Sequence, residues 1–147
     1  TGHYPDLVAR VLSRTTGPQT PRWKVSDIFF KESNGNETYI EVKSPKPNKG
    51  QCVEIADRQL HIHAIRKSGP PKVRTYFAMA YNPYGDKKAD YNHSFKRYLD
   101  MDRQVLLGAE FWDLVGGTGT YQEVLSIYRE VGLEKGPEMI RQLGLSF

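Results

Sequence analysis

The sequence predicts an α/β fold in which a central mixed β-sheet is flanked by helices. Two runs of β-forming residues, 23–31 and 38–44, enclose the polar segment ESNGNE, which indicates a hairpin. Residues 54–67 have helical composition and stop at SGPP. Residues 73–81, VRTYFAMAY, are typical of a strand buried on both faces. Strand, helix and strand in succession predict a crossover, so the strand of 73–81 should lie parallel to that of 38–44.

The remaining elements are expected to flank this unit. Residues 5–14 place apolar side chains at helical spacing behind a proline at the position that a helix tolerates best. The run QVLLG, 104–108, predicts a further strand. Two helices, 121–131 and 134–143, should close the chain, the first of them with a capping-box pattern that starts at Thr120.

Composition describes a globular protein of ordinary size. The 147 residues suffice for one domain, 1–147, and no repeat suggests a second. Because the chain opens with Thr1, it could be the carboxyl-terminal part of a longer protein. No apolar run approaches the ~18 residues that a membrane helix needs. The single Cys52 fits a reducing cytoplasm, and the net charge of +4 is compatible with a polyanionic partner.

The register of the predicted hairpin can be tested against its hydrophobic pattern. A two-residue NG turn would set Ile28 opposite Glu41 and mix apolar with charged side chains on both faces. An odd-numbered loop, for example NGN, pairs Ile28 with Val42 and Phe30 with Ile40. A slip of one residue sends every side chain to the wrong face, so the pattern favours the odd loop. Each strand should then bury one face only.

The same register gathers three polar residues on the opposite face. Asp27 falls opposite Lys43 and beside Glu41, which shares a face with Lys43 because the two are separated by one residue of a strand. Two carboxylates can hold Mg²⁺, and a neighbouring lysine can orient or deprotonate water and offset transition-state charge on a phosphodiester. An exposed strand edge with an ordinary glutamate–lysine pair would show the same pattern.

Basic and polar residues follow the second strand directly. In SPKPNKGQ, Lys46 and Lys49 are placed to follow DNA phosphates, and Gln51 to touch a phosphate or the attacking water. Arg58, on the predicted helix, is a further candidate for DNA contact. A solvated turn with ordinary surface lysines is the alternative. Outside this segment, His61 and His63 lie two apart and so on different faces of a helix, which excludes a helical metal pair.

These residues resemble a known family. Asp27, the strand motif Glu41-Val42-Lys43, a helix and a buried strand are together similar to the PD-(D/E)XK nuclease superfamily. Ser26 departs from that pattern, because it stands where the superfamily name has a proline. Four blocks resemble type II restriction endonucleases of the TdeIII family: YIEVKSPKPNKGQ, YFAMAYNPYG, EFWDLVGG and YQEVLSIYREVG.

The resemblance implies a restriction-endonuclease-like fold and a set of roles. Asp27 and Glu41 would be metal ligands together with the backbone carbonyl of Val42, and Lys43 would be the catalytic lysine. The cofactor would be Mg²⁺, the substrate double-stranded DNA with a short specific sequence, and the protein a homodimer in a prokaryotic cytoplasm, within a restriction-modification system. A DNA repair or recombination nuclease and a non-catalytic DNA-binding module remain the alternatives.

Overall fold

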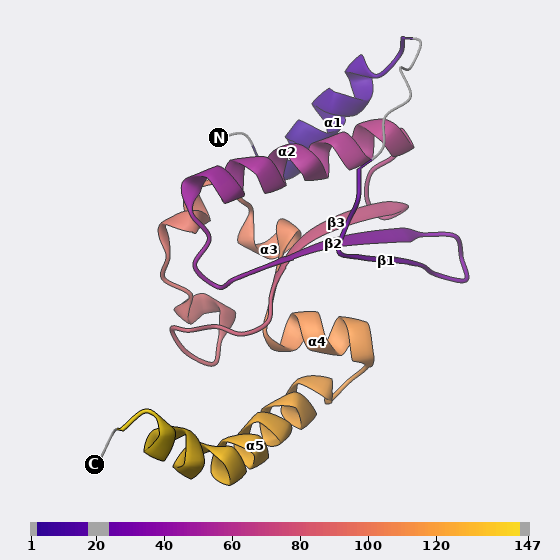
Figure 1. Ribbon diagram of the computed structural model, residues 1–147. Coiled ribbons are helices and arrows are strands. Elements are labelled where there is room, and N and C mark those ends of the chain that lie inside the picture. The colour runs from indigo at the N-terminus through magenta and orange to yellow at the C-terminus, as the bar shows by residue number, and fades with distance from the viewer. Residues whose placement is uncertain (1–2, 18–23, 145–147) are drawn as a thin grey trace. The chain divides into compact units, whose positions relative to one another are not determined.

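The computed structural model describes residues 3–17 and 24–144 (Figure 1). The chain divides into two compact units, one that ends at Gly108 and one that begins at Ala109. Within the described residues, no helix is both long enough and apolar enough to cross a membrane.

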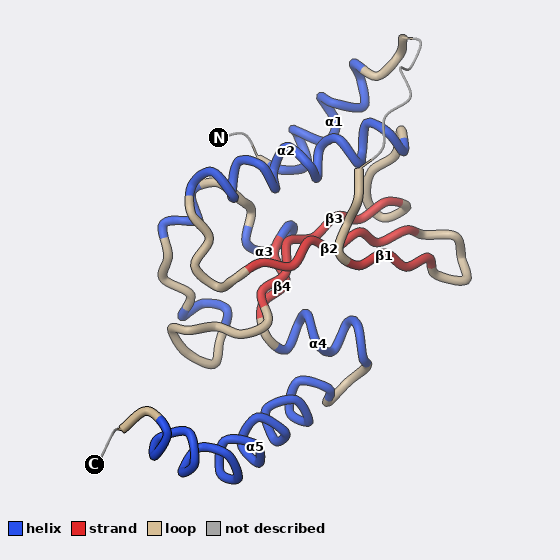
Figure 2. The backbone as a smooth tube through the Cα atoms, in the orientation of Figure 1, coloured by secondary structure: helices blue, strands red, loops and turns tan. Residues whose placement is uncertain are grey.

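The first unit is built on a four-stranded mixed sheet with the order β1-β2-β3-β4 (Figure 2). The strands are β1 (Ile28–Lys31), β2 (Glu37–Lys43), β3 (Val73–Met79) and β4 (Val105–Leu107). Strand β1 runs antiparallel to β2, whereas β2, β3 and β4 are parallel to one another. The predicted α/β class, the hairpin and the parallel crossover are therefore confirmed. The expected start of the first strand at Trp23 lies outside the described residues.

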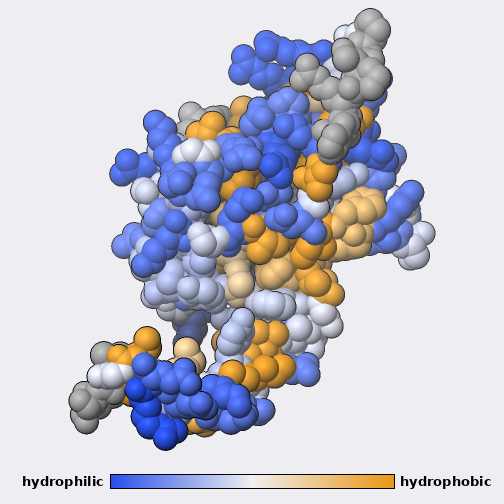
Figure 3. All heavy atoms as spheres, in the orientation of Figure 1, coloured by the Kyte–Doolittle hydropathy of each residue, from blue (hydrophilic) through white to orange (hydrophobic). Residues whose placement is uncertain are grey.

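The first unit also holds the helices α1 (Tyr4–Arg14), α2 (Lys49–Arg66) and α3 (Met101–Gln104), with two short 3₁₀ turns, Lys88–Asp90 and Ser94–Arg97. Helix α2 begins five residues before the expected start at residue 54. The outer side of α1 and α2 is largely hydrophilic (Figure 3).

A capping box explains the early start of α2. The Asn48 side chain accepts a hydrogen bond from the Gln51 amide, and the Gln51 side-chain oxygen accepts one from the Asn48 amide, both at 2.9 Å. Each bond satisfies an amide that would otherwise have no intrahelical partner, so the turn that the sequence suggested as loop becomes helix.

The hairpin has an odd loop, as predicted, but its register differs by two residues. Ile28 pairs with Ile40 and Phe30 with Thr38, so the expected pairing of Ile28 with Val42 is wrong. Residues 32–36 form a five-residue loop in place of the three-residue one. A shift of two keeps each side chain on its face, which is why the hydrophobic pattern alone could not detect it.

Hydrogen bonds within the loop favour the longer connection. Glu32 and Asn36 close it through a backbone bond of 2.8 Å from the Glu32 amide. Inside, the Asn34 side chain accepts from the Asn36 amide at 2.9 Å, and Gly35 takes a φ of +88°, which glycine adopts without strain.

The main core of the first unit lies on the face of the sheet that carries Glu41. Glu41 pairs with Phe77 in the β2–β3 ladder, so both side chains point to the same side. Phe77 is fully buried there in a cluster with residues of α2, β3, β4 and the intervening loop: Cys52, Ile55, Phe77, Met79, Tyr91, Leu99, Val105 and Leu107. On the other face Ile40 is also fully buried. The expectation that β2 buries one face only is therefore wrong, because α2 packs on the face that was assigned to polar residues.

An ion pair fixes the carboxyl end of α2 to β2. Arg66 donates two hydrogen bonds to the Glu37 carboxylate, one of them from Nε at 2.7 Å, and the Tyr39 hydroxyl donates a third at 2.9 Å. Burial opposes ionisation of Glu37, but the bonds from Arg66 and Tyr39 outweigh it and hold the pKa of this carboxyl below its usual value.

A buried polar group fixes α1 to the rest of the unit. The Nδ1 atom of His63 donates to the Ser68 carbonyl at 2.9 Å, so its Nε2 atom accepts from the Tyr4 hydroxyl at 2.8 Å. The Thr75 hydroxyl donates in turn to Tyr4 at 2.6 Å. His63 is fully buried, whereas the side chain of His61 is 37% exposed, as expected for two faces of one helix.

The second unit consists of α4 (Ala109–Gly116) and α5 (Thr120–Gln142). The two expected helices are one, so the predicted break near residue 132 is wrong. Gly132 costs about 1 kcal/mol in a helix without ending it, and α5 also continues through Gly136 and Pro137. Thr120 is the first helical residue and Gly119 the cap, which corrects the predicted capping box. The Tyr121 amide donates to the Asp113 side chain at 3.1 Å and so ties α5 to α4.

Stability should fall in mildly acidic solution because of His63. Burial lowers the pKa of His63 below its ordinary value of 6.5, although the bond to Ser68 opposes this. Below about pH 6.5 the unfolded chain therefore binds more protons than the folded protein, and the free energy of unfolding should decrease as the pH falls. Urea unfolding between about pH 7.5 and pH 5.5 measures this. His61→Gln should keep the decrease, and a constant or rising stability would contradict the assignment.

Removal of Arg66 should loosen α2. Arg66→Ala leaves the Glu37 carboxylate without its cation, although Glu37 is only 6% exposed. We expect a loss of about 1–2 kcal/mol in the free energy of unfolding, less than for a fully buried pair because Arg66 itself is half-exposed. Arg10→Ala, which removes an exposed arginine of α1, should cost less than about 0.5 kcal/mol. Equal losses for the two variants in chemical denaturation would argue against the role of the pair.

Candidate active site

Glu41 lies near the carboxyl end of β2, on the side of the sheet that faces α2. Its side chain is 6% exposed, and each carboxylate oxygen contacts a cation. The Oε1 atom lies 2.7 Å from Nζ of Lys43, and Oε2 lies 2.8 Å from Nη1 of Arg58. A buried carboxylate needs such partners, since an unpaired charge at this depth would be costly.

Asp27 precedes β1 and contacts β2 through its side chain, not through a backbone pair of the β-ladder. The paired residues of β1 begin at Ile28, so the expected position of Asp27 opposite Lys43 in the ladder is wrong. Its exposed carboxylate accepts a hydrogen bond of 2.7 Å from the backbone amide of Val42. Asp27 therefore lies beside the strand residue that separates Glu41 from Lys43, and the three side chains are gathered at one end of β2.

Lys43 is held in its charged form. The hydrogen bond to Glu41 raises the pKa of the Lys43 ammonium above its ordinary 10.5, burial opposes this, and the charges of Glu41 and Asp27 raise it further. The group is therefore a proton-bearing cation at neutral pH. In this form it can donate to an oxygen that gains negative charge, but it cannot accept a proton from water.

Arg58 points toward the sheet. Besides Glu41, its guanidinium donates to Oε1 of Glu54 at 2.9 Å and to the carbonyl of Val25 at 3.2 Å. The sequence suggested a DNA contact for Arg58, and in the structure both of its terminal nitrogens donate to protein acceptors. The spacing of four between Glu54 and Arg58 on a helix could have revealed one of these pairs. Nothing in the sequence connects Arg58 to Glu41, 17 positions earlier.

The other predicted DNA contacts surround the start of α2. Lys46 and Lys49 are exposed, and the Lys46 ammonium lies 5.6 Å from the centre of the Tyr84 ring, a cation–π distance. The Tyr91 hydroxyl donates to the Pro45 carbonyl at 2.7 Å, which connects the long loop after β3 to the segment after β2. The side-chain oxygen of Gln51 is engaged in the capping box, so its amide nitrogen is the atom left to reach a ligand.

The donors near Glu41 suit a hard cation. The carboxylates of Asp27 and Glu41 and the carbonyl of Val42 are oxygen ligands of the kind that Mg²⁺ takes. In the part of the chain that the structure describes, no three acidic, histidine or cysteine side chains gather into a metal site. A cation here would thus have two protein carboxylates and fill its remaining positions with a carbonyl, water or phosphate oxygens, as Mg²⁺ usually does.

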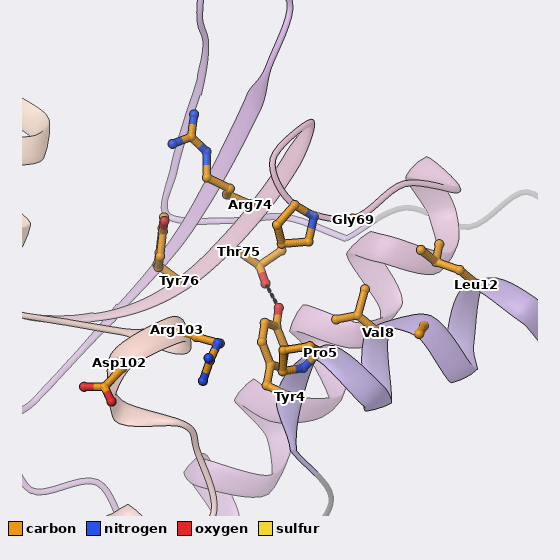
Figure 4. Close-up of a pocket in the computed structure, with 12 residues that line it drawn as sticks. Tyr4, Pro5, Val8, Leu12, Gly69, Arg74, Thr75, Tyr76, Asp102 and Arg103 are labelled. Carbon is orange, nitrogen blue, oxygen red and sulfur yellow. Dashed lines mark hydrogen bonds between the residues drawn. The ribbon is translucent and has the colours of Figure 1, made fainter.

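A pocket beside α1 shares no residues with the candidate site. It has a volume of about 600 Å³ and is lined by residues of α1, β3 and α3, among them Val8, Leu12, Tyr76 and Arg103 (Figure 4). The Tyr4–Thr75 hydrogen bond crosses its wall. None of the predicted site residues lines it.

Comparison with known proteins identifies relatives of this chain. The chain is 45% identical over 119 residues to the type II restriction enzyme HgiCII of Herpetosiphon aurantiacus, a match that covers 80% of this chain and 44% of the relative. It is 44% identical over 119 residues to HgiEI of the same organism, covering 80% of this chain and 43% of the relative. The chain thus spans less than half the length of these curated relatives. No solved structure gives a significant match.

The family model for the type II restriction endonuclease HinfI matches residues 8–132. The type of enzyme is the one that the sequence blocks suggested, although the matching family carries the name HinfI and not TdeIII. Because the match covers most of the chain and includes every residue of the candidate site, the chain belongs to the HinfI family of type II restriction endonucleases.

Proposed function

We propose that this chain carries the catalytic site of a Mg²⁺-dependent type II restriction endonuclease, which hydrolyses both strands of double-stranded DNA at a short specific sequence. The observation that supports it most is the gathering of Asp27, Glu41 and Lys43 at one end of β2, by the Val42–Asp27 and Glu41–Lys43 contacts, in a chain of this family.

Each residue of the group has a proposed role. Asp27, Glu41 and the carbonyl of Val42 hold Mg²⁺, which when bound supplies an activated water and offsets charge on the phosphate. The Lys43 ammonium donates to a phosphate oxygen as negative charge develops there. Because this lysine is kept protonated by Glu41, we assign it charge stabilisation and not proton abstraction.

The DNA contacts are proposed for the surface beside this group. Lys46 and Lys49 contact phosphates next to the scissile one, with Gln51 within the same first turn of α2. A palindromic site calls for a twofold protein, so we propose a homodimer in a prokaryotic cytoplasm. We also propose that both units belong to one nuclease domain, since the family match runs across the boundary at Gly108.

Digestion of a defined plasmid tests the proposed activity. With Mg²⁺ the protein should convert unmethylated plasmid into discrete fragments whose ends share one short sequence, and chelation of the metal should stop the reaction. Sequencing of the fragment ends measures this. Smeared products, or cuts only at branched or damaged DNA, would favour a repair or recombination nuclease, and absence of cleavage together with DNA binding would favour a binding module.

Substitution of the gathered residues tests the roles. Asp27→Ala and Lys43→Ala should each lower the cleavage rate by more than about 10²-fold, because one removes a metal ligand and the other a preorganised charge. Affinity for DNA in a gel-shift assay should change far less. Asp57→Ala, which removes an exposed carboxylate of α2 that pairs with His61, should cleave at the wild-type rate. Unchanged cleavage in either site variant would refute the assignment of that residue.

A further inference from the structure

The Glu41 carboxylate, with a single negative charge, contacts two cations. Lys43 and Arg58 contact its two oxygens at 2.7 and 2.8 Å, and both are cations at neutral pH. A divalent cation at the same carboxylate would stand a few ångströms from two like charges. Such repulsion weakens binding unless one of the two side chains withdraws.

Arg58 is the side chain with another place to go. Its Nη2 atom already bonds Oε1 of Glu54 at 2.9 Å, one helical turn before it on α2. The Glu54 side chain is 60% exposed, so it can follow the guanidinium outward without loss of burial. Lys43 has no such partner outside the group, because the anions that act on it, Glu41 and Asp27, are both proposed metal ligands.

The present position of Arg58 is also incompletely satisfied. Among the buried side-chain nitrogens and oxygens of the described residues, only Nε of Arg58 and Nε of Arg74 have no hydrogen-bond partner in the protein. A buried donor without a partner costs free energy, so withdrawal from this position costs less than withdrawal from a saturated one.

Arg66, on the same helix, forms a bidentate pair with a glutamate of the same strand. It donates from Nε and from a terminal nitrogen to both oxygens of Glu37. Arg58, in contrast, divides its terminal nitrogens among two carboxylates and the Val25 carbonyl, and it gives Glu41 a single bond. The Arg58–Glu41 pair, with one hydrogen bond, can therefore open more easily than the Arg66–Glu37 pair, which has two.

We propose that Arg58 is a positioning residue that serves as an internal counterion of Glu41: it holds the carboxylate in place when no divalent cation is bound, and it shifts toward Glu54 when a cation binds. The inference rests on the proposed metal site at Glu41. Arg58 thereby keeps the buried carboxylate paired and oriented, and its displacement lowers the affinity for the cation.

Calorimetric titration of the purified protein with Ca²⁺, which takes the same oxygen ligands, tests the proposal without DNA and without cleavage. Arg58→Gln should bind Ca²⁺ roughly fivefold tighter than wild type, because one competing charge is gone. Arg58→Lys, which keeps the charge, should remain within about twofold of wild type. Glu54→Gln should bind roughly threefold more weakly, because Arg58 then has no second carboxylate.

The matched control is Arg66→Gln, which removes a pair between the same helix and strand and should leave the affinity for Ca²⁺ unchanged. Affinity for Ca²⁺ in Arg58→Gln that equals or falls below that of wild type would overturn the proposal. If Arg58→Gln does not fold, as judged by circular dichroism, the affinity of Glu54→Gln for Ca²⁺ tests the proposal instead. An affinity equal to that of wild type would overturn the proposal. Glu41→Gln separates the two levels: if it binds Ca²⁺ as wild type does, the proposed metal site itself is wrong.

Discussion

Helix α2 lies against strand β2 through two glutamate–arginine pairs, and the spacing of these pairs determines where the candidate site can form. Glu37 and Glu41 are four residues apart on the strand, a rise of about 13 Å. Arg66 and Arg58 are eight residues apart on the helix, a rise of about 12 Å. Because the two rises match and the order is reversed, both pairs form when the helix runs antiparallel to the strand.

This arrangement reconciles burial with charge. The face of β2 that carries the glutamates is also the face on which α2 packs, next to Phe77 and Met79. A carboxylate there would be expelled or protonated without a partner, and the helix supplies one at each position. Glu41 differs from Glu37 because it has a second cation, Lys43, and a nearby anion, Asp27. The charges of Glu41 and Asp27 both raise the pKa of Lys43. The charged group at this end is thus the one to which we assign the proposed site.

The sequence could predict the elements and the faces but not the details that depend on distant contacts. Period-two alternation was enough to group Ile28, Phe30 and Ile40 on one face and to require an odd loop. It could not distinguish loops of three and five residues, because both keep each side chain on its face; the hydrogen bonds within the loop, among them that between Glu32 and Asn36, favour the longer one.

For the candidate site, too, the sequence predicted which residues take part but not all of their contacts. Sequence spacing places Glu41 and Lys43 on one face, and the family motif points to Asp27. The contact of Asp27 with the Val42 amide and the pairing of Arg58 with Glu41 follow from how the hairpin and α2 pack, so no local pattern contains them. Likewise, burial of both faces of β2 depends on where α2 packs, which hydrophobic alternation in the strand does not reveal.

The most direct test of the central claim is the location of a divalent cation in the folded protein. Crystals grown with Mn²⁺, which takes the oxygen ligands of Mg²⁺ and scatters anomalously, would show it. We predict an anomalous peak at the end of β2, with oxygens of Asp27 and Glu41 and the carbonyl of Val42 at metal-ligand distance. A peak held by other residues, with Glu41 still bound only by Lys43 and Arg58, would contradict the account.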